Sequence, residues 1–299
     1  MDAVSLLQTA SAFLLNVGFA WLAGSWIARH WLRSNGANAG GVEPQLRRTD
    51  LAAAGMSTLG SVTALLAATA VMGDVGLREA CPIFWMMLTS TDYGHAGSVT
   101  IAAMLAMLLI RGLGGTGRAT TICASLALLL FVVTRASMGH AGEEGLLSGA
   151  LAAEALHYAA IGLWTGAVLV SGWFALHDAR IGTSATGAHD RYLELMSKAA
   201  MAAVIAIIAT GAYSAWHRVG SAEHLQHTFY GKTLLLKVAL VMLAVALGGY
   251  NKFIGLPAAR RSNQGLRQVR TALRLESAVL LGAMLAASVL STQQPPAAM

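Results

Sequence analysis

The chain has 299 residues, of which 56% are hydrophobic and 11% are charged. An ordinary soluble domain carries roughly 25% charged residues, and the mean hydropathy of +0.60 also lies on the apolar side. This composition excludes a sizeable soluble domain and indicates that lipid surrounds most of the chain.

Long apolar segments recur along the sequence with little polar sequence between them. A membrane-spanning helix needs about 20 mainly apolar residues, whereas barrel strands would alternate in polarity, unlike the apolar run 124–133. We therefore predict an all-α integral membrane protein that forms one polytopic domain over 1–299, with loops at 74–94 and 251–271. The eight predicted transmembrane helices cover 4–31, 51–73, 95–111, 119–137, 149–176, 197–217, 232–250 and 272–291.

Basic residues gather in alternate loops, and the loops between them hold mostly acids. The basic side carries Arg29, Arg33, Arg47, Arg48, Arg111, Arg118, Arg180, Arg191, Lys198, Lys252, Arg260, Arg261, Arg267, Arg270 and Arg274. The positive-inside rule makes this side cytoplasmic, so both termini are predicted to be periplasmic. The net charge of +6 then reflects contact with the lipid bilayer, and no nucleic-acid partner is expected. No Lys or Arg precedes the first apolar segment, which predicts a retained helix rather than a cleaved signal peptide.

A short pattern occurs twice. Thr91-Asp92-Tyr93-Gly94 precedes the third predicted helix, and Thr228-Phe229-Tyr230-Gly231 precedes the seventh. Trp21 to Gly24 in the first helix and Trp164 to Gly166 in the fifth form a second, similar pair. These matches indicate two parallel four-helix repeats, 1–138 and 139–299, although such short matches also arise by chance.

Most of the nine histidines fall at or near the predicted outer side. Imidazole is the commonest metal ligand, and thioether sulfur favours Cu(I); Met138, close to His140, supplies such a sulfur. Solvated loop histidines would produce part of this clustering, so His224 and His227 are weaker candidates. The outer histidines are His95, His140, His157, His217, His224 and His227.

His157 lies about two turns inside its predicted helix, where an ionisable side chain is costly unless it faces water or a partner. Glu154 precedes it by three residues, so both side chains share one helix face, and the carboxylate could ligate the same ion or orient the imidazole. A hydrogen-bonded core histidine is the alternative. Glycines at 139 and 142 allow a close backbone approach beside His140, for which a plain turn histidine is the alternative.

Other ionisable side chains also lie within or near the predicted spans. Arg135 and Lys237 lie near the outer ends of their helices and are expected to pair with acids such as Glu154. Because cations repel metal ions, we assign them structural or gating roles. Trp164 lies deeper than the interfacial tryptophans and is given a packing or site role. Glu276 is expected to reach the cytoplasmic interface by snorkelling.

Several motifs in order along the chain have the spacing of a known family. They are Gly139-His140-Ala141-Gly142, the segment His157–Gly166 with Trp164, Thr228-Phe229-Tyr230-Gly231-Lys232, Leu235-Leu236-Lys237 and Asn251. Together they resemble the copper-resistance protein D family. One departure is that the usual Trp-x-Gly-Gly reads Trp164-Thr165-Gly166-Ala167 here, where alanine still permits close helix packing.

The resemblance implies a protein of the bacterial inner membrane that serves copper homeostasis and moves copper across the membrane with a periplasmic copper-binding carrier. We predict a site for Cu(I) or Cu(II) formed by His95, His140 and His157, with Met138 or Asp92 assisting. Few metal-binding side chains are found on the inner side of His157. The pattern indicates no oligomeric state.

Two other functions remain open. A haem-binding electron-transfer protein would use a pair such as His140 and His157 as axial ligands. An assembly factor would deliver copper to a membrane enzyme without importing it. The sequence contains no phosphate-cradling glycine loop and no Ser-His-Asp order, so enzymatic activity is not expected.

Overall fold

The computed structural model describes residues 2–34, 43–115, 117–145, 147–176, 186–219 and 227–293. The side chains of residues 34, 140, 186–190 and 217–219 fall outside that description. The described residues contain helices and no strand, and eight of these helices are long and apolar enough to cross a membrane. The predicted all-α, multi-pass membrane fold is confirmed.

The helices follow one another with short connections. In chain order they are α1 (Ala3–Ser34), α2 (Glu43–Met72), α3 (Leu77–Ser90), α4 (Asp92–Leu113), α5 (Arg118–Ser137), α6 (His140–Glu143), α7 (Gly149–Val170), α8 (Thr186–Val219), α10 (Phe229–Tyr250), α11 (Leu256–Arg261) and α12 (Asn263–Leu290). Two π-helical segments, η2 (Ser171–Ala175) and η4 (Asn251–Gly255), continue α7 and α10.

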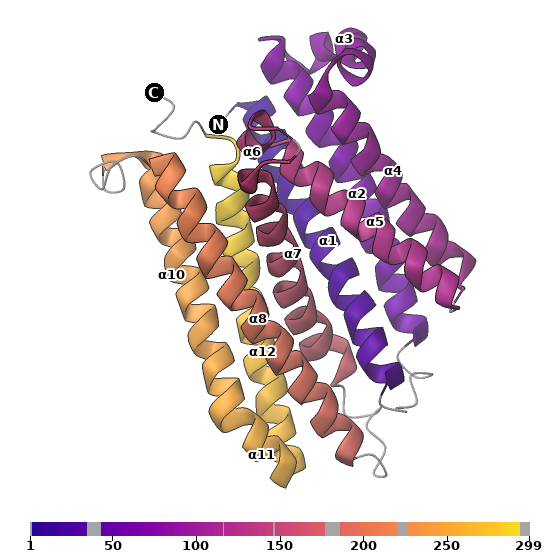
Figure 1. The fold of residues 1–299 in the computed structure, drawn as a ribbon, viewed down its shortest axis with the longest axis vertical. Helices are drawn as coiled ribbons and strands as arrows, with labels where there is room; N and C mark the ends of the chain where they lie inside the picture. The colour runs from indigo at the N-terminus through magenta and orange to yellow at the C-terminus, as the bar shows by residue number, and fades with distance from the viewer. Residues whose placement is uncertain are drawn as a thin grey trace.

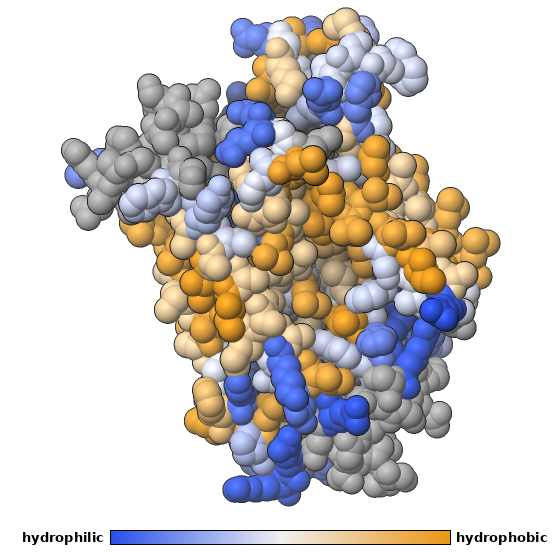
Figure 2. Space-filling view, in the orientation of Figure 1, coloured by the Kyte–Doolittle hydropathy of each residue, from blue (hydrophilic) through white to orange (hydrophobic). Residues whose placement is uncertain are grey.

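The helix α1 lies beside α7 at the centre of the bundle (Figure 1). The helices α2, α4 and α5 pack on one side of this pair, and α8, α10 and α12 pack on the other. The start of α1 and the end of α12 lie at the same end of the bundle, together with α3 and α6. Figure 2 shows apolar side chains around the middle of the visible face and hydrophilic ones towards both ends, as a membrane-spanning bundle requires.

Two glycines hold α1 against α7. A Cβ atom added to Gly24 would overlap the backbone of Gly166, and one added to Gly166 would overlap the carbonyl oxygen of Ala20. Small residues let membrane helices approach until their backbones touch. The two Trp-and-Gly motifs of the sequence therefore meet at one helix crossing.

Buried side chains form a large apolar core on each side of this crossing. One core joins α1, α7, α8 and α12 around Trp164, Val168 and Tyr192. The other joins α1, α2, α4 and α5 around Leu22, Met104 and Phe131. The helix α1 contributes to both cores and so contacts helices of both the N-terminal and the C-terminal half.

The predicted loop at 74–94 is wrong over Leu77–Ser90, which form α3. This helix is about 21 Å long at 1.5 Å per residue, which is shorter than the ~30 Å of hydrocarbon that a span must cross. Met87 packs on Leu65 and Ala68 of α2, while Trp85 is 73% exposed. A hydropathy search for full spans misses a helix of this kind.

The predicted loop at 251–271 is also wrong, because η4, α11 and the first turns of α12 occupy it. Likewise α2 begins at Glu43 and α8 at Thr186, rather than at 51 and 197. Arg, Lys, Gln and Glu are good helix formers, so helices continue into the polar region after the apolar pattern stops.

The two T-x-Y-G motifs each begin a helix. The N–H of Gly94 donates to Thr91 Oγ1 at 2.9 Å at the start of α4, and the N–H of Gly231 donates to Thr228 Oγ1 at 2.9 Å at the start of α10. Threonine is a favoured N-cap residue. Helix capping therefore accounts for the threonine and its spacing to the glycine, and the two-repeat interpretation stays a prediction.

We expect Gly166→Ala to destabilise the protein by about 1–3 kcal/mol, the usual cost of overpacking a close contact, because the new methyl group would overlap the carbonyl of Ala20. Thermal unfolding of purified protein, followed by circular dichroism, measures the change. Gly55→Ala is the matched control, since no atom lies within 4 Å of the added carbon there. Equal unfolding temperatures for the two variants would show that the crossing is not tightly packed.

Candidate functional site

A cavity of about 190 Å³ lies between α1, α7, α8, α10 and α12, with α5 at its edge. Five of the predicted site residues line it together, although they come from three helices: Arg135, Glu154, His157, Trp164 and Lys237. Glu154 lies near the end of α7 that faces α6, and Trp164 lies ten residues, or about 15 Å, farther along the helix. The cavity thus runs along α7 from the end of the bundle that carries α3 and α6 to Trp164.

His157 is held by a hydrogen bond to α8. Its Nδ1 lies 2.8 Å from Thr210 Oγ1, and the Thr210 hydroxyl donates its hydrogen to the Ala206 carbonyl oxygen at 2.6 Å. A hydroxyl has one hydrogen to donate, so while Thr210 donates to the Ala206 carbonyl it accepts from Nδ1–H of His157. In that tautomer the lone pair is on Nε2, and a neutral imidazole can bind a metal through that nitrogen.

Two cations share the cavity with Glu154. The guanidinium of Arg135 lies over the ring of Tyr158, with 5.9 Å between its central carbon and the ring centroid. Its Nε is buried and has no hydrogen-bond partner among the described residues. The pairing of Arg135 with acids such as Glu154 stays a prediction. Lys237 of α10 also lines the cavity.

Glu276 forms a buried polar contact beside the inner end of the cavity. Trp164 Nε1 donates to Glu276 Oε1 at 2.9 Å, and Asn251 Nδ2 donates to Glu276 Oε2 at 3.4 Å. Glu276 is 2% exposed, so the prediction that it snorkels to the interface is wrong. Its partners among the described residues are neutral groups, and π-helix η4 carries Asn251, in line with the frequent use of π-bulges at functional sites.

The other predicted ligands lie elsewhere. Asp92 and His95 are exposed in the first turn of α4, where His95 Nε2 lies 3.0 Å from the Thr89 carbonyl oxygen. Met138 packs with the apolar cluster of α2, α3 and α4. The side chain of His140 lies outside the described residues, as do the side chain of His217 and all of His224. His227, just before α10, is exposed.

No group of three or more His, Cys, Asp or Glu that could hold a metal ion occurs among the described residues. The side chain of His140, which belongs to α6 between α5 and α7, lies outside the described residues. Within the described part, His157 and Glu154 are the predicted ligand and its predicted helper that lie together in the cavity. A metal centred there would draw on them first.

Three residues of this region were missed in the sequence. Tyr230 and Met284 line the cavity, and Glu276 lies behind Trp164. Tyr230 stands inside the second T-x-Y-G motif, which in the sequence indicates the repeat and the family resemblance and gives the tyrosine no role in the site. Glu276 carried a usable signal, since an acid in an apolar segment is a candidate functional residue by default, whereas Met284 looks like any other apolar residue of its helix.

Comparison with known proteins identifies a family. The model of "Copper resistance protein D-like, N-terminal domain" matches residues 1–150, and the model of "Copper resistance protein D" matches residues 189–290. Copper resistance protein D of Pseudomonas syringae pv. tomato is 29% identical over 243 residues, which cover 75% of this chain and 74% of that relative. No solved structure matches the chain.

We expect Trp164→Phe to lower the free energy of unfolding by about 1–3 kcal/mol, because it removes the N–H that satisfies a buried carboxyl oxygen. Thermal unfolding compared with Trp85→Phe, at an indole that is 73% exposed, measures the effect. A loss no larger than that of Trp85→Phe would mean that the Trp164 to Glu276 hydrogen bond contributes nothing.

Proposed function

The chain belongs to the copper resistance protein D family, and on that premise we propose that it is a copper-binding protein of the bacterial inner membrane that receives copper from a periplasmic carrier in the cavity along α7. The observation that carries this proposal is the hydrogen bond between His157 and Thr210, which orients the imidazole in the cavity as a group behind a metal ligand does. Glu154, three residues away on the same helix, supplies a carboxylate. His140, whose side chain is undescribed, is the third proposed ligand.

The charges of the cavity favour transfer from a carrier over capture of a free ion. Arg135 and Lys237 line the same space as His157, and their positive charges repel a free cation. A carrier that hands copper over by exchange of one ligand at a time avoids this repulsion, because the ion remains coordinated throughout. The two cations would then act as a gate against other metal ions.

A route inward is proposed through the contact at Trp164. Glu276 and Asn251 lie behind the indole, and Asn251 Oδ1 is buried without a hydrogen-bond partner. A buried carboxylate with neutral partners lowers the cost of bringing a cation into the apolar interior. We propose that copper passes from His157 past Trp164 to Glu276 and then towards the basic end of the bundle.

The volume of the cavity disfavours haem as its occupant. Sites for drug-sized ligands occupy roughly 300–1,000 Å³, and the cavity has about 190 Å³. This volume suits an ion with its side-chain ligands. An assembly factor that binds copper at the outer end without passing it on would use the same His157 site and is separated from an importer by the transport measurement below.

For purified protein loaded with Cu(I) under reducing conditions, we expect His157→Ala to lose most of the bound copper and Thr210→Val to bind it about 10–100-fold more weakly, the usual effect of removing a group that orients a ligand. Equilibrium competition with a chromophoric chelator gives the affinities, and elemental analysis gives the stoichiometry.

His95→Ala is the matched control, because His95 does not line the cavity, and it should retain copper. Thr58→Val, which removes a hydroxyl bonded only within its own helix, controls for Thr210. Unchanged copper in His157→Ala, or a Soret band in the visible spectrum of the purified protein, would contradict the proposed site.

In proteoliposomes, we expect Glu276→Gln to bind copper like the wild type and to move it across the membrane at least about tenfold more slowly, since the variant lacks the charge that offsets a buried cation. The variant should fold, because glutamine can still accept from Trp164 and can donate to the free Oδ1 of Asn251. Accumulation of copper inside the vesicles, followed with time, is the measurement. Wild-type uptake by Glu276→Gln would exclude the proposed route, and no uptake by the wild type would favour the assembly-factor alternative.

A further inference from the structure

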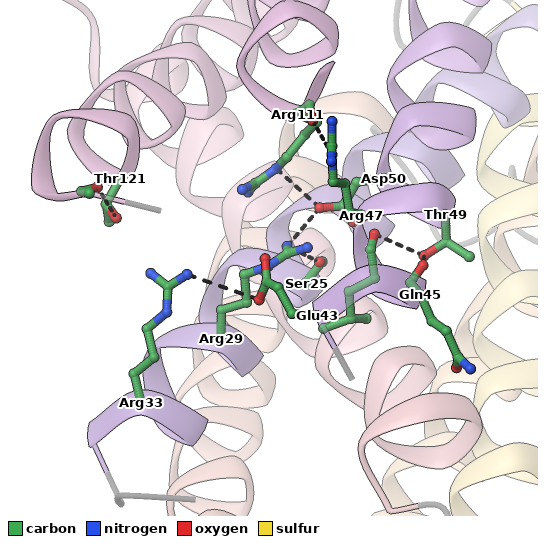
Figure 3. Close-up of polar contacts among 12 residues, drawn as sticks. Ser25, Arg29, Arg33, Glu43, Gln45, Arg47, Thr49, Asp50, Arg111 and Thr121 are labelled. Carbon is green, nitrogen blue, oxygen red and sulfur yellow. Dashed lines mark hydrogen bonds and ion pairs between the residues drawn. The ribbon is translucent and has the colours of Figure 1, made fainter. Parts of the chain in front are cut away.

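A second, smaller pocket lies between α1, α4 and α5 at the basic end of the bundle. It has a volume of about 60 Å³ and is lined mainly by cationic and hydroxyl side chains: Arg29, His30, Arg33, Arg111, Thr120 and Thr121, with Trp26. In Figure 3 the guanidinium groups of Arg33 and Arg111 and the side chain of Thr121 surround the same space. This pocket shares no lining residue with the cavity that contains His157.

The acids beside the pocket do not balance its arginines. Asp50, which is fully buried, accepts from Arg29 Nη1 at 2.6 Å and pairs with Arg111 Nε at 3.1 Å. Glu43 accepts from Arg29 Nε at 2.9 Å and lies 4.0 Å from Arg33. Among the described residues, three guanidinium groups of the pocket therefore face two carboxylates.

Two donors of the lining side chains are buried without a partner. Arg29 Nη2 has no hydrogen-bond acceptor among the described residues, and neither has Trp26 Nε1. The Arg29 side chain is only 5% exposed, so water does not readily satisfy it. A buried donor without an acceptor is costly, and this cost falls if an anion occupies the pocket.

The N-terminal end of α5 adds to the positive electrostatic potential of the pocket. This helix has 20 residues, and its N-cap, Gly117, has no side-chain hydrogen bond to the first turn. The free N–H groups and the positive end of the helix dipole attract anions, and Thr120 and Thr121 of the first two turns line the pocket.

We propose that this pocket binds a phosphate group, either the phosphodiester of an anionic membrane lipid or inorganic phosphate. The arginines that line the pocket, with the buried Nη2 donor of Arg29, suit the negative oxygens of a phosphodiester or a phosphate ion. The planar fork of arginine suits phosphate oxygens, and basic pockets between membrane helices bind lipid head groups. The volume, a few times the roughly 10–15 Å³ that one water requires, admits a phosphate group and excludes a nucleotide.

The test counts lipids bound to the full-length protein in detergent by native mass spectrometry, with equal amounts of phosphatidylglycerol and phosphatidylcholine. The wild type should prefer phosphatidylglycerol, and Arg33→Gln should weaken its binding by about tenfold, the effect of losing one charge-assisted hydrogen bond. Arg267→Gln is the control, because it removes the same charge from an exposed site near the start of α12. Thr120→Glu, which adds a negative charge at the pocket, provides a second variant that keeps every arginine.

A separate measurement identifies the source of the phosphate. Inorganic phosphate is added at constant ionic strength, and thermal unfolding is followed for the wild type and Arg33→Gln. Stabilisation that depends on Arg33, without preferential binding of phosphatidylglycerol, assigns the pocket to free phosphate, whereas preferential lipid binding that depends on Arg33 assigns it to lipid. The proposal is overturned if neither phosphate source depends on Arg33 and Thr120, or if Arg267→Gln has the same effect as Arg33→Gln.

Discussion

The backbone contact between α1 and α7 sets the geometry on which the rest of the structure depends. Lipid provides no hydrophobic force between membrane helices, so their association rests on close fit, and Gly24 and Gly166 allow that fit at the centre of the bundle. Trp164 stands two residues before Gly166, so the contact also fixes the inner end of the cavity. One turn earlier, a Cβ atom at Gly162 would overlap the ring of Phe19. Gly162 and Gly166 lie on α7, the helix that carries His157. The same close packing therefore joins the two halves of the bundle and determines the shape of the cavity.

The sequence predicts the eight membrane-spanning segments correctly, but it does not predict the residues at which the helices begin and end. A span is fixed by a local property, about 20 apolar residues in succession, and each segment carries that signal alone. The ends depend on where the chain can keep its hydrogen bonds outside the hydrocarbon, and good helix formers such as the arginines of 260–270 carry α11 and α12 beyond the apolar pattern. The sequence did not predict α3 for a related reason. This helix is too short to span the membrane, and its buried face packs on α2. Its stability comes from that tertiary contact, which hydropathy does not contain.

In the candidate site, too, features that depend on neighbouring residues in the sequence are predictable, and features that depend on residues far apart in the sequence are not. The three-residue spacing of Glu154 and His157 follows from helix geometry, and both line the cavity. The orientation of His157 depends on Thr210, which is 53 residues away, and the role of Glu276 depends on Trp164, which is 112 residues away. Neither pairing leaves a pattern in one sequence. Arg135 and Glu154 come from different helices and line the same cavity, a proximity that charge and depth in the sequence do not decide by themselves.

The two buried carboxylates of the bundle differ in how their charge is balanced, and this difference separates the two halves. Asp50 meets Arg29 and Arg111, so its charge is compensated at all times and it holds α1, α2 and α4 together at the basic end. Glu276 meets the neutral amide of Asn251 and an indole N–H, without a cation among the described residues. A carboxylate in an apolar interior without a counter-ion is unfavourable. An ion pair that is already complete gains nothing from a second cation, whereas the uncompensated acid does. The C-terminal half is therefore the half through which we propose that copper passes, and the ion pairs of Asp50 hold helices of the N-terminal half together.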